Sequence, residues 1–350
     1  MMAKILMLYP NDLSPSDLEK KPIAGTQTAF IELSRAFAKL GHQVCVLTRT
    51  SELLDTESYK WLHLDEANTN GEFDLMIVNV SIGLFNQFKH VKAKRKVLWI
   101  HNEAKYLIYW SRLRNLILFR PIIVFSGEYH ASTLPFFIPT GRRVIIPYGL
   151  SEQILISERH AQLTPAPKVF FTSNPLRSLR WLVDLWVEHI NPVIPEAELH
   201  IFSSWKTYGK WGESVKVRMK QEMEYVSGFS NAKVIIRDVL PKQDLFNEML
   251  NGRAIFYKGD KAETFCLAVA EAQALGLPAV VTDLGSMKER VVHEQTGFVA
   301  KDDNEFVDYA LKVLTDDQLW NRLRNNALEH GKELTWRRSA KAFMELTYKK

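Results

Sequence analysis

The sequence has few cysteines and none of the common nucleotide or hydrolase signatures. Its 350 residues include two cysteines, Cys45 and Cys266, so a disulfide framework is excluded and a reducing compartment is the expected setting. No group of Cys and His has the spacing of a zinc site. The sequence also lacks a P-loop, a Gly-x-Ser-x-Gly and a Gly-x-Gly-x-x-Gly. The usual signatures of ATPases, serine hydrolases and dinucleotide-binding enzymes are therefore missing.

Long apolar runs are also missing. None approaches the ~20 residues that a bilayer-spanning helix needs. The longest candidate, residues 113–125, is interrupted by Arg114, Arg120 and Pro121. The apolar run in residues 1–10 is too short for a secretory signal and is typical of a buried strand. We expect a cytoplasmic protein, and 46% hydrophobic with 24% charged residues is an ordinary globular composition.

Charge is balanced overall but unevenly placed. The formal net charge is +5, and residues 1–150 hold all of this excess, with 18 Lys and Arg against 13 Asp and Glu. So modest an imbalance does not indicate a nucleic-acid partner. It fits a basic face toward an anionic acceptor or an anionic membrane surface.

Apolar strand-like runs alternate with helical patterns in both halves of the chain, which predicts an α/β fold with parallel sheets covered on both faces. The predicted strands are residues 4–9, 44–48, 75–80, 97–100, 122–125 and 144–149, then 169–172, 199–202, 234–236, 254–257 and 279–282.

These two series predict two Rossmann-like domains that face a cleft. We assign residues 1–155 to an N-terminal domain, 156–167 to a linker, 168–335 to a C-terminal domain and 336–350 to a last helix. Ligands of open α/β sheets bind beyond the carboxyl ends of the strands, so the segments after each strand are the ones that matter for function.

The segment from Glu263 to Asp283 is the most informative. Apolar residues at helical spacing predict a helix with Thr264 as its N-cap and Gly276 at its end. The free amides at its start would form an anion site suited to a diphosphate, and they belong to Phe265, Cys266 and Leu267.

Two carboxylates bracket this anion site. On a continuous helix Glu263 and Glu271 would lie roughly 12 Å apart along the axis, which is too far for the carboxylate pair of an ordinary glycosidase. That spacing suits groups that bind a sugar and a ribose on either side of a diphosphate. The alternative is a pair of solvated helix carboxylates.

This stretch resembles the Glu-x7-Glu signature of retaining GT-B glycosyltransferases of family GT4. The resemblance implies that Glu263 contacts the hydroxyls of the donor sugar and that Glu271 binds the nucleotide ribose. Many family members have Gly where Cys266 stands, and a β-carbon there narrows the approach to the diphosphate.

Resemblance to the same family extends to the N-terminal half. Residues 22–28 resemble its glycine-containing loop after the first strand, with Gly25 allowing close approach of a ligand and Ala24 in place of a second glycine. His101 ends a buried strand and resembles the family histidine that faces the donor sugar. The alternatives are a plain turn glycine and a structural histidine.

Residues 173–179 resemble the family segment Ser-Arg-x-x-Lys-Gly-Leu, whose basic pair neutralises the leaving diphosphate. Arg177 takes the Lys position, and Asn174 replaces the Arg, so one charge is missing unless Arg180 or Lys258 supplies it. The alternative for Arg177 is a surface arginine at a helix start. Val239 begins a loop that resembles the one whose backbone reads the base.

Two basic segments fall outside these motifs. The run of five cations in residues 89–96 is typical of a solvated helix end. Residues 105–120 mix aromatic side chains with Lys105, Arg112, Arg114 and Arg120, which suits either an anionic membrane surface or an ordinary core-packing helix.

The resemblance therefore implies a GT-B fold and a metal-independent, retaining hexosyltransferase without a resident cofactor. It also implies that residues 1–155 bind the acceptor, that residues 168–335 bind the nucleotide sugar, and that the helix in residues 336–350 returns to the N-terminal domain. Its predicted donor is a UDP- or GDP-sugar, and its predicted acceptor is a glycan or lipid-linked hydroxyl in bacterial surface polysaccharide or glycolipid assembly. Nucleic acid is not an expected partner, and an association with the inner face of the cytoplasmic membrane would suit the acceptor. The alternatives are a GT-B nucleotide-sugar epimerase and a non-catalytic GT-B partner of another transferase.

Overall fold

The structure is a computed structural model that describes residues 2–65, 69, 71–155 and 164–348. The chain divides into two compact units. Unit 1 holds Met1–Leu18, Thr26–Gly149 and Thr335–Lys350, and unit 2 holds Glu19–Gly25 and Leu150–Leu334. The C-terminal residues thus group with the N-terminal sheet. Residues 156–163 of the predicted linker lie outside the described residues.

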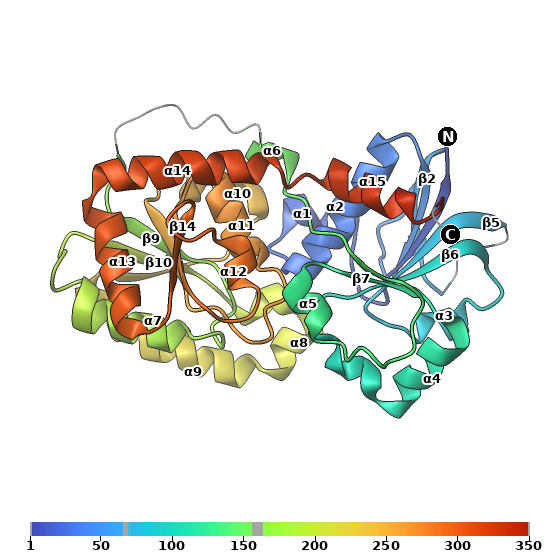
Figure 1. Cartoon of the computed structure of the whole chain (residues 1–350), viewed down its shortest axis with the longest axis horizontal. Coiled ribbons are helices and arrows are strands. Elements are labelled where there is room, and N and C mark those ends of the chain that lie inside the picture. The colour runs from blue at the N-terminus through green and yellow to red at the C-terminus, as the bar shows by residue number, and fades with distance from the viewer. Residues whose placement is uncertain (1, 66–68, 70, 156–163, 349–350) are drawn as a thin grey trace. The chain divides into compact units, whose positions relative to one another are not determined.

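Unit 1 is built on an eight-stranded sheet with the order β3-β4-β2-β1-β5-β6-β7-β8 (Figure 1). Its strands are β1 (Lys4–Leu8), β2 (Gln43–Thr48), β3 (Leu54–Asp55), β4 (Tyr59–His63), β5 (Glu72–Asn79), β6 (Lys92–Trp99), β7 (Ile122–Phe125) and β8 (Arg143–Ile145). β3 pairs antiparallel with β4, whereas the other pairs are parallel. The sequence did not predict β3 or β4, because β4 lies near the sheet edge with mostly half-buried residues and has no apolar run.

The basic run at residues 89–96 is a correction to the sequence analysis. It was expected to be a solvated helix end, but its larger part begins strand β6. Parallel pairing with β5 sets Lys92 opposite Glu72 and Arg95 opposite Leu75. Backbone pairing with the neighbouring strand therefore makes these polar residues part of a strand. The fully buried residues of β6 begin only at Val97.

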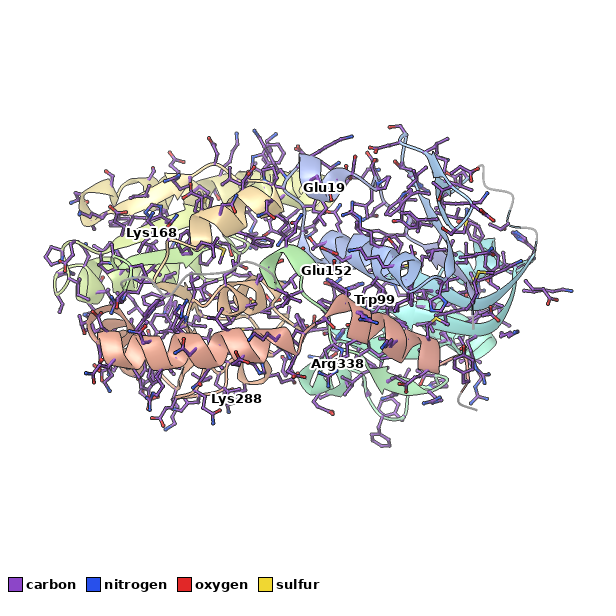
Figure 2. The ribbon with its side chains drawn as sticks, turned by 90° about the horizontal axis from the view of Figure 1, so that it is seen from above. Glu19, Trp99, Glu152, Lys168, Lys288 and Arg338 are labelled. Atoms are coloured by element: carbon purple, nitrogen blue, oxygen red, sulfur yellow. The ribbon has the colours of Figure 1, made fainter. Side chains whose placement is uncertain are left out.

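Helices cover the sheet of unit 1, and the last helix of the chain is one of them. They are α1 (Asp17–Lys20, which spans the unit boundary), α2 (Gly25–Lys39), α3 (Leu84–Gln87), the 3-10 turn η1 (Ala104–Ile108), α4 (Trp110–Phe119), α5 (Glu128–Ser132) and α15 (Trp336–Glu345). Phe343 of α15 packs edge-on against Phe37 and Trp99, with ring centres 6.1 and 5.5 Å apart. Figure 2 labels Trp99 and Arg338, the latter on α15. The Ser339 hydroxyl donates to the Pro147 carbonyl at 2.7 Å. These contacts hold α15 on the N-terminal sheet, as predicted.

Unit 2 is built on a six-stranded parallel sheet with the order β11-β10-β9-β12-β13-β14. Its strands are β9 (Lys168–Phe171), β10 (Glu198–Phe202), β11 (Val234–Arg237), β12 (Ala254–Tyr257), β13 (Ala279–Thr282) and β14 (Gly297–Ala300). The sequence analysis did not predict strand β14, which lies at the sheet edge. A β-carbon on Gly297 would lie 2.1 Å from the Ala279 carbonyl oxygen, so this glycine allows the edge strand to pair closely with β13.

The helices of unit 2 alternate with these strands. They are α6 (Glu152–Leu155), α7 (Leu179–Leu185) with a π-helical turn (Trp186–Ile190), η3 (Trp205–Tyr208), α8 (Gly209–Ser214), α9 (Lys216–Ser227), η4 (Ser230–Ala232), α10 (Lys242–Met249), α11 (Leu267–Ala274), α12 (Met287–Arg290), α13 (Asp303–Thr315) and α14 (Asp317–Lys332).

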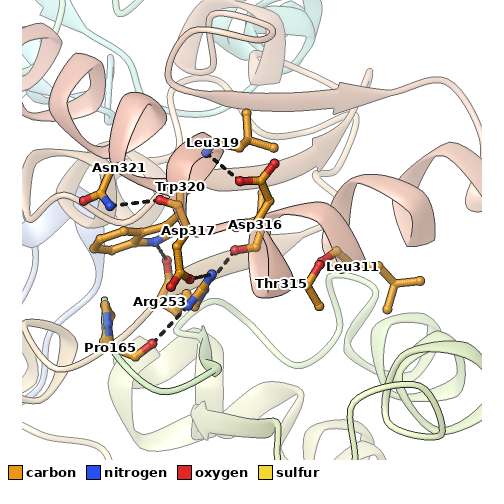
Figure 3. A network of polar contacts seen from close by, with 10 residues as sticks. Pro165, Arg253, Leu311, Thr315, Asp316, Asp317, Leu319, Trp320 and Asn321 are labelled. Carbon is orange, nitrogen blue, oxygen red and sulfur yellow. Dashed lines mark hydrogen bonds and ion pairs between the residues drawn. The ribbon is translucent and has the colours of Figure 1, made fainter. Parts of the chain in front are cut away.

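A buried arginine, Arg253, connects α14 with the amino end of β12 through hydrogen bonds (Figure 3). Arg253 donates to Asp317 at 2.7 Å and to the Val313 carbonyl at 2.9 Å, and its own carbonyl accepts from the Trp320 indole at 2.7 Å. Ligands of such sheets bind at the carboxyl ends of the strands, which lie at the opposite edge. We therefore assign the Arg253 guanidinium a structural role.

Candidate active site

The centre of the candidate site in unit 2 is an ion pair between Arg177 and Glu263. Arg177 follows β9 and Glu263 follows β12, which are adjacent strands, so both residues lie beyond the same sheet edge. Arg177 Nη1 donates to Glu263 Oε2, and the hydroxyl of Tyr257 donates to the same oxygen at 3.0 Å. The side chains keep 29% and 13% of their surface exposed, so a ligand can reach the pair.

Electrostatics keep the guanidinium of this pair charged. Burial has the largest single effect and lowers the pKa of Arg177, but Glu263, Tyr257, Asp260 and Cys266 together outweigh it, so the pKa of the guanidinium is raised. Burial, followed by Glu263, raises the pKa of Tyr257 well above its ordinary value, so this phenol remains a hydrogen-bond donor. The sequence analysis predicted Arg177 and Glu263 as site residues but not Tyr257. Tyr257 was missed because it ends an apolar run that is typical of a buried strand.

The helix after Glu263 begins later than predicted. α11 starts at Leu267, with Cys266 as its N-cap at φ +62°, so Thr264 is not the cap. A left-handed φ is unfavourable for a residue with a β-carbon and is the conformation that glycine adopts readily. This geometry gives a physical reason for the glycine of many family members at this position. Burial raises the pKa of the Cys266 thiol, which is therefore neutral.

Because Glu263 is not helical, the predicted separation of about 12 Å along one helix axis does not apply. A separate loop fixes the backbone of Glu263. The Ser286 amide donates to the Glu263 carbonyl at 3.0 Å, and a β-carbon on Gly285 would lie 2.7 Å from that carbonyl oxygen. Only a glycine at Gly285, whose φ is +61°, allows the loop after β13 to approach Glu263 this closely.

The second glutamate is buried and paired with a lysine. Lys242 Nζ donates to both oxygens of Glu271, at 2.8 and 2.6 Å. Burial raises the pKa of the Glu271 carboxyl and Lys242 opposes that rise. Lys242 was not predicted, although it directly follows the Val239-Leu240-Pro241 loop, which does come before α10 as the sequence indicated.

The candidates for the missing second charge have other partners. Asn174 forms a local turn, since its side-chain oxygen accepts from the Leu176 amide at 2.9 Å. Arg180 Nε donates to Glu222 at 3.1 Å, and its guanidinium lies 3.9 Å from the Tyr225 ring centre, so it is directed toward α9. Lys258 lies over the ring of Trp181 at 4.3 Å. The structure thus separates Arg180 from the role predicted for it.

A different arginine lies beside the anion site and was missed by sequence reasoning. The guanidinium carbon of Arg290 is 4.1 Å from the ring centre of Phe265, next to the N-cap of α11. Arg290 is 7% exposed, and among the buried atoms of the described residues its Nε lacks a hydrogen-bond partner. Burial lowers the pKa of its guanidinium. The buried guanidinium of Arg290, whose Nε has no hydrogen-bond partner, adds positive potential near the start of α11.

Gly25 groups with unit 2 rather than with the rest of α2. A β-carbon there would lie 3.7 Å from Leu267 Cβ, which is ordinary contact. The predicted loop glycine therefore lies beside the first residue of α11. Packing alone does not demand glycine at this position.

The predicted residue in unit 1, His101, belongs to a neutral network. Its Nε2 donates to Asn79 Oδ1 at 2.5 Å, and its Nδ1 accepts from the Tyr148 hydroxyl. The side chain is buried, and burial lowers its pKa to about 3. Both ring nitrogens already have protein partners. A ligand can therefore bind a ring nitrogen only if it replaces Asn79 or Tyr148 as the hydrogen-bond partner.

Within the described part of the chain, no three His, Cys, Asp or Glu side chains are grouped closely enough to hold a metal ion. No helix in that same part is both long and apolar enough to cross a bilayer.

Comparison with known families adds to this geometry. Residues 230–330 match the family described as glycosyl transferases group 1. This range contains Glu263, the start of α11, Glu271 and Lys242. This part of the chain is therefore similar to the glycosyl transferases group 1.

Curated proteins match the chain over short stretches. A D-inositol 3-phosphate glycosyltransferase of Jonesia denitrificans is 32% identical over 80 residues, which is 22% of this chain and 19% of that relative. An N-acetyl-alpha-D-glucosaminyl L-malate synthase of Bacillus anthracis is 30% identical over 92 residues, or 26% of this chain and 24% of the relative. The matched stretch spans about a fifth to a quarter of these relatives.

Solved structures match over almost the whole chain. A sucrose-phosphate synthase of Thermosynechococcus elongatus has a TM-score of 0.77 at 15% identity, covering 99% of this chain and 98% of the other. The HepE protein of Anabaena, in complex with UDP and glucose, has a TM-score of 0.68 at 15% identity and covers 99% of both chains. The fold of the chain is therefore GT-B, as predicted.

Proposed function

We propose that the protein transfers a hexose-type sugar, with retention of configuration, from a nucleotide diphosphate-sugar to an acceptor hydroxyl. The observation that carries this proposal is the Arg177–Glu263 pair beside the start of α11, with Glu271 one helical turn further along. A cation and a helix N-terminus suit a diphosphate, and the two carboxylates suit the hydroxyl groups on either side of it. Neighbours in complex with UDP and sugar support a UDP-sugar as donor.

In this proposal the donor opens the ion pair. A diphosphate oxygen takes the place of Glu263 on Arg177, and Glu263 then accepts hydrogen bonds from sugar hydroxyls. The bond from the anomeric carbon to the diphosphate breaks as the acceptor oxygen bonds to the same face of that carbon. The acceptor proton passes to the leaving phosphate. Arg177 and the amides of α11 stabilise the charge that grows there, so no divalent metal is required.

Acceptors on a glycan or a lipid carrier in bacterial surface-polymer assembly would suit this protein, at the inner face of the cytoplasmic membrane. Two of the similar proteins are named for transfer to an inositol phosphate and for the synthesis of a glucosaminyl malate, and these functions belong to those proteins. Their shared feature is a hydroxyl near an anionic group. The basic excess of residues 1–150 favours an acceptor of the same kind here.

The donor is identified by thermal shift with UDP-, GDP-, ADP- and TDP-sugars. A true donor at 100 times its dissociation constant should stabilise the fold by about 2.7 kcal/mol. NMR of the product then reports the anomeric configuration. Activity that EDTA abolishes and magnesium restores would contradict the metal-free mechanism. Turnover of the donor into its epimer without an acceptor would replace transfer by epimerisation.

A further inference from the structure

Positive charge in unit 1 is concentrated in one part of the sequence. Residues 89–145 carry 11 Lys and Arg against 2 Asp and Glu, whereas the whole chain has a net charge of +5. The remainder of the protein is therefore net negative. None of these cations belongs to the candidate active site, so the concentration needs a separate explanation.

Five of these cations line a cavity of about 340 Å³: Lys94, Arg95, Lys96, Arg120 and Arg142. No acidic residue is among the described residues that line it. The cavity lies at the amino ends of β6 and β7 and at the last turn of α4, whereas the His101 network follows the carboxyl end of β6. Lys94 is held by Asp74 at 2.7 Å, and Lys96 lies 5.3 Å from the Phe119 ring centre. The cavity has the charge and size for a phosphate-bearing headgroup.

The helix that ends at this cavity has an apolar outer face. Trp110, Ile117 and Leu118 of α4 are 74%, 51% and 65% exposed. They are spaced at i, i+7 and i+8, so they share one face, and exposed Arg114 lies between them. The opposite face, with Leu116, is buried in the core. An exposed apolar stripe interleaved with arginine is typical of helices that lie in a membrane interface.

A rigid aromatic loop lies next to the same helix end. Phe136 and Phe137 are 91% and 70% exposed. Arg143 holds this loop from within by donating to the carbonyls of Pro135 and Ile138 at 2.8 and 3.0 Å. The loop joins the end of α4, because the Gly141 amide donates to the Pro121 carbonyl at 3.0 Å. The two phenyl rings pack edge-on against each other, with ring centres 5.6 Å apart, and both remain largely exposed to water.

We propose that this surface docks on an anionic lipid bilayer. Phe136, Phe137 and the outer face of α4 enter the interface, and the basic cavity receives a lipid phosphate. A nucleic acid would use the cations but would leave the apolar side chains in water, so the combination favours a bilayer. The inference rests on the proposed function only in that a lipid-linked acceptor gives the docking a purpose.

The test is vesicle flotation without donor or acceptor, so a failure of docking is separate from a failure of transfer. Wild-type protein should float with phosphatidylcholine vesicles that contain phosphatidylglycerol and not with phosphatidylcholine alone. Phe136→Ser with Phe137→Ser should lower binding about tenfold or more. Arg120→Gln with Arg142→Gln should lower it about fivefold for each charge removed. All variants should keep the wild-type circular dichroism and thermal transition.

Matched controls come from the exposed face of unit 2. Trp211→Ser with Val217→Ser, and Arg218→Gln with Lys220→Gln, should bind vesicles as wild type does. Equal binding to both vesicle types, or equal losses in the control variants, would overturn the proposal. Release by inorganic phosphate would indicate a soluble anion site, and binding of an oligonucleotide that survives the phenylalanine changes would indicate a nucleic-acid surface. Either result would also overturn it.

Discussion

The two units share one topology but differ in the chemistry beyond their strands. In unit 2, charged groups follow the strands in ion pairs, Arg177 with Glu263 and Lys242 with Glu271. In unit 1, the buried groups that follow β6 and β7 are neutral, and burial lowers the pKa of His101 to about 3 and that of His130 to about 4. The strand ends of unit 2 therefore carry charged groups that suit an anion, whereas those of unit 1 carry neutral groups that suit uncharged hydrogen-bonding partners.

This difference indicates a division of tasks. A diphosphate carries its charge in the ground state and gains more as it leaves, so cations and helix amides are best placed on the unit that holds it. A hydroxyl group carries no charge, so neutral hydrogen-bonding groups such as those of unit 1 can also bind it. The predictions below test whether the charge in unit 2 and the neutrality in unit 1 both matter.

The largest effect is expected for Arg177→Ala. The variant removes a charge-assisted contact to the diphosphate and leaves Glu263 without its cation, so kcat/KM should fall about 100-fold or more. Arg253→Ala is the matched control, since Arg253 is also a buried, paired arginine of unit 2. It should lower the free energy of unfolding by about 1–3 kcal/mol and leave kcat/KM of the folded protein unchanged. Equal losses of activity in the two variants would mean that Arg177 has only a structural role.

The next effect separates the two glutamates. Glu263→Gln should mainly lower kcat, by about 10- to 100-fold, because its carboxylate faces positive charge that develops only in the transition state. Glu271→Ala should mainly raise the donor KM, because ribose is held equally in both states. The free nucleotide diphosphate is the control. Its affinity should fall in Glu271→Ala and remain in Glu263→Gln, and any other pattern contradicts the assignment.

In unit 2 the sequence singled out residues but did not predict their geometry. Strand ends and the Glu-x7-Glu spacing pointed to Arg177, Glu263 and Glu271, whose roles stay predictions. They did not indicate that α11 begins only at Leu267, because the left-handed Cys266 is set by the tertiary structure and not by local propensity. Partners such as Lys242 and Arg290 were missed for a related reason, since a lysine on a surface-like helix and an arginine after a glutamate carry no periodic signal.

In unit 1 the sequence located the strands with apolar runs and missed those without. β4 and the first half of β6 are polar by composition, and their pairing is fixed by neighbours far away in the chain. The sequence also gave no means to see that Asn79 and Tyr148 occupy the ring nitrogens of His101. The distinction between a histidine that meets a ligand and one that is internally satisfied depends on contacts 22 and 47 residues away.

The neutrality of unit 1 should make it sensitive to acid. His101 and His130 are held neutral in the fold but titrate near 6.5 when unfolded, so their contribution to stability is present above pH 6.5 and is lost as the pH falls toward 3–4. For each of the two histidines, the free energy of unfolding should fall by about 2 kcal/mol between pH 6.5 and pH 5. Urea unfolding across this range should show the loss. It should be smaller in His130→Gln and unchanged in His189→Gln, which alters an exposed histidine.

The smallest effect concerns the cation beside Glu271. Burial raises the pKa of this carboxyl and Lys242 opposes the rise, so Lys242→Met should raise it further. A carboxylate accepts ribose hydroxyls only in its ionised form, which is lost as the pH falls. The donor KM of the variant should therefore rise about threefold at pH 8 and more at pH 6, while kcat changes little. Lys242→Arg keeps the charge and should restore the flat pH profile. If Lys242→Met raises KM equally at both pH values, Lys242 only shapes the pocket and does not set the charge of Glu271.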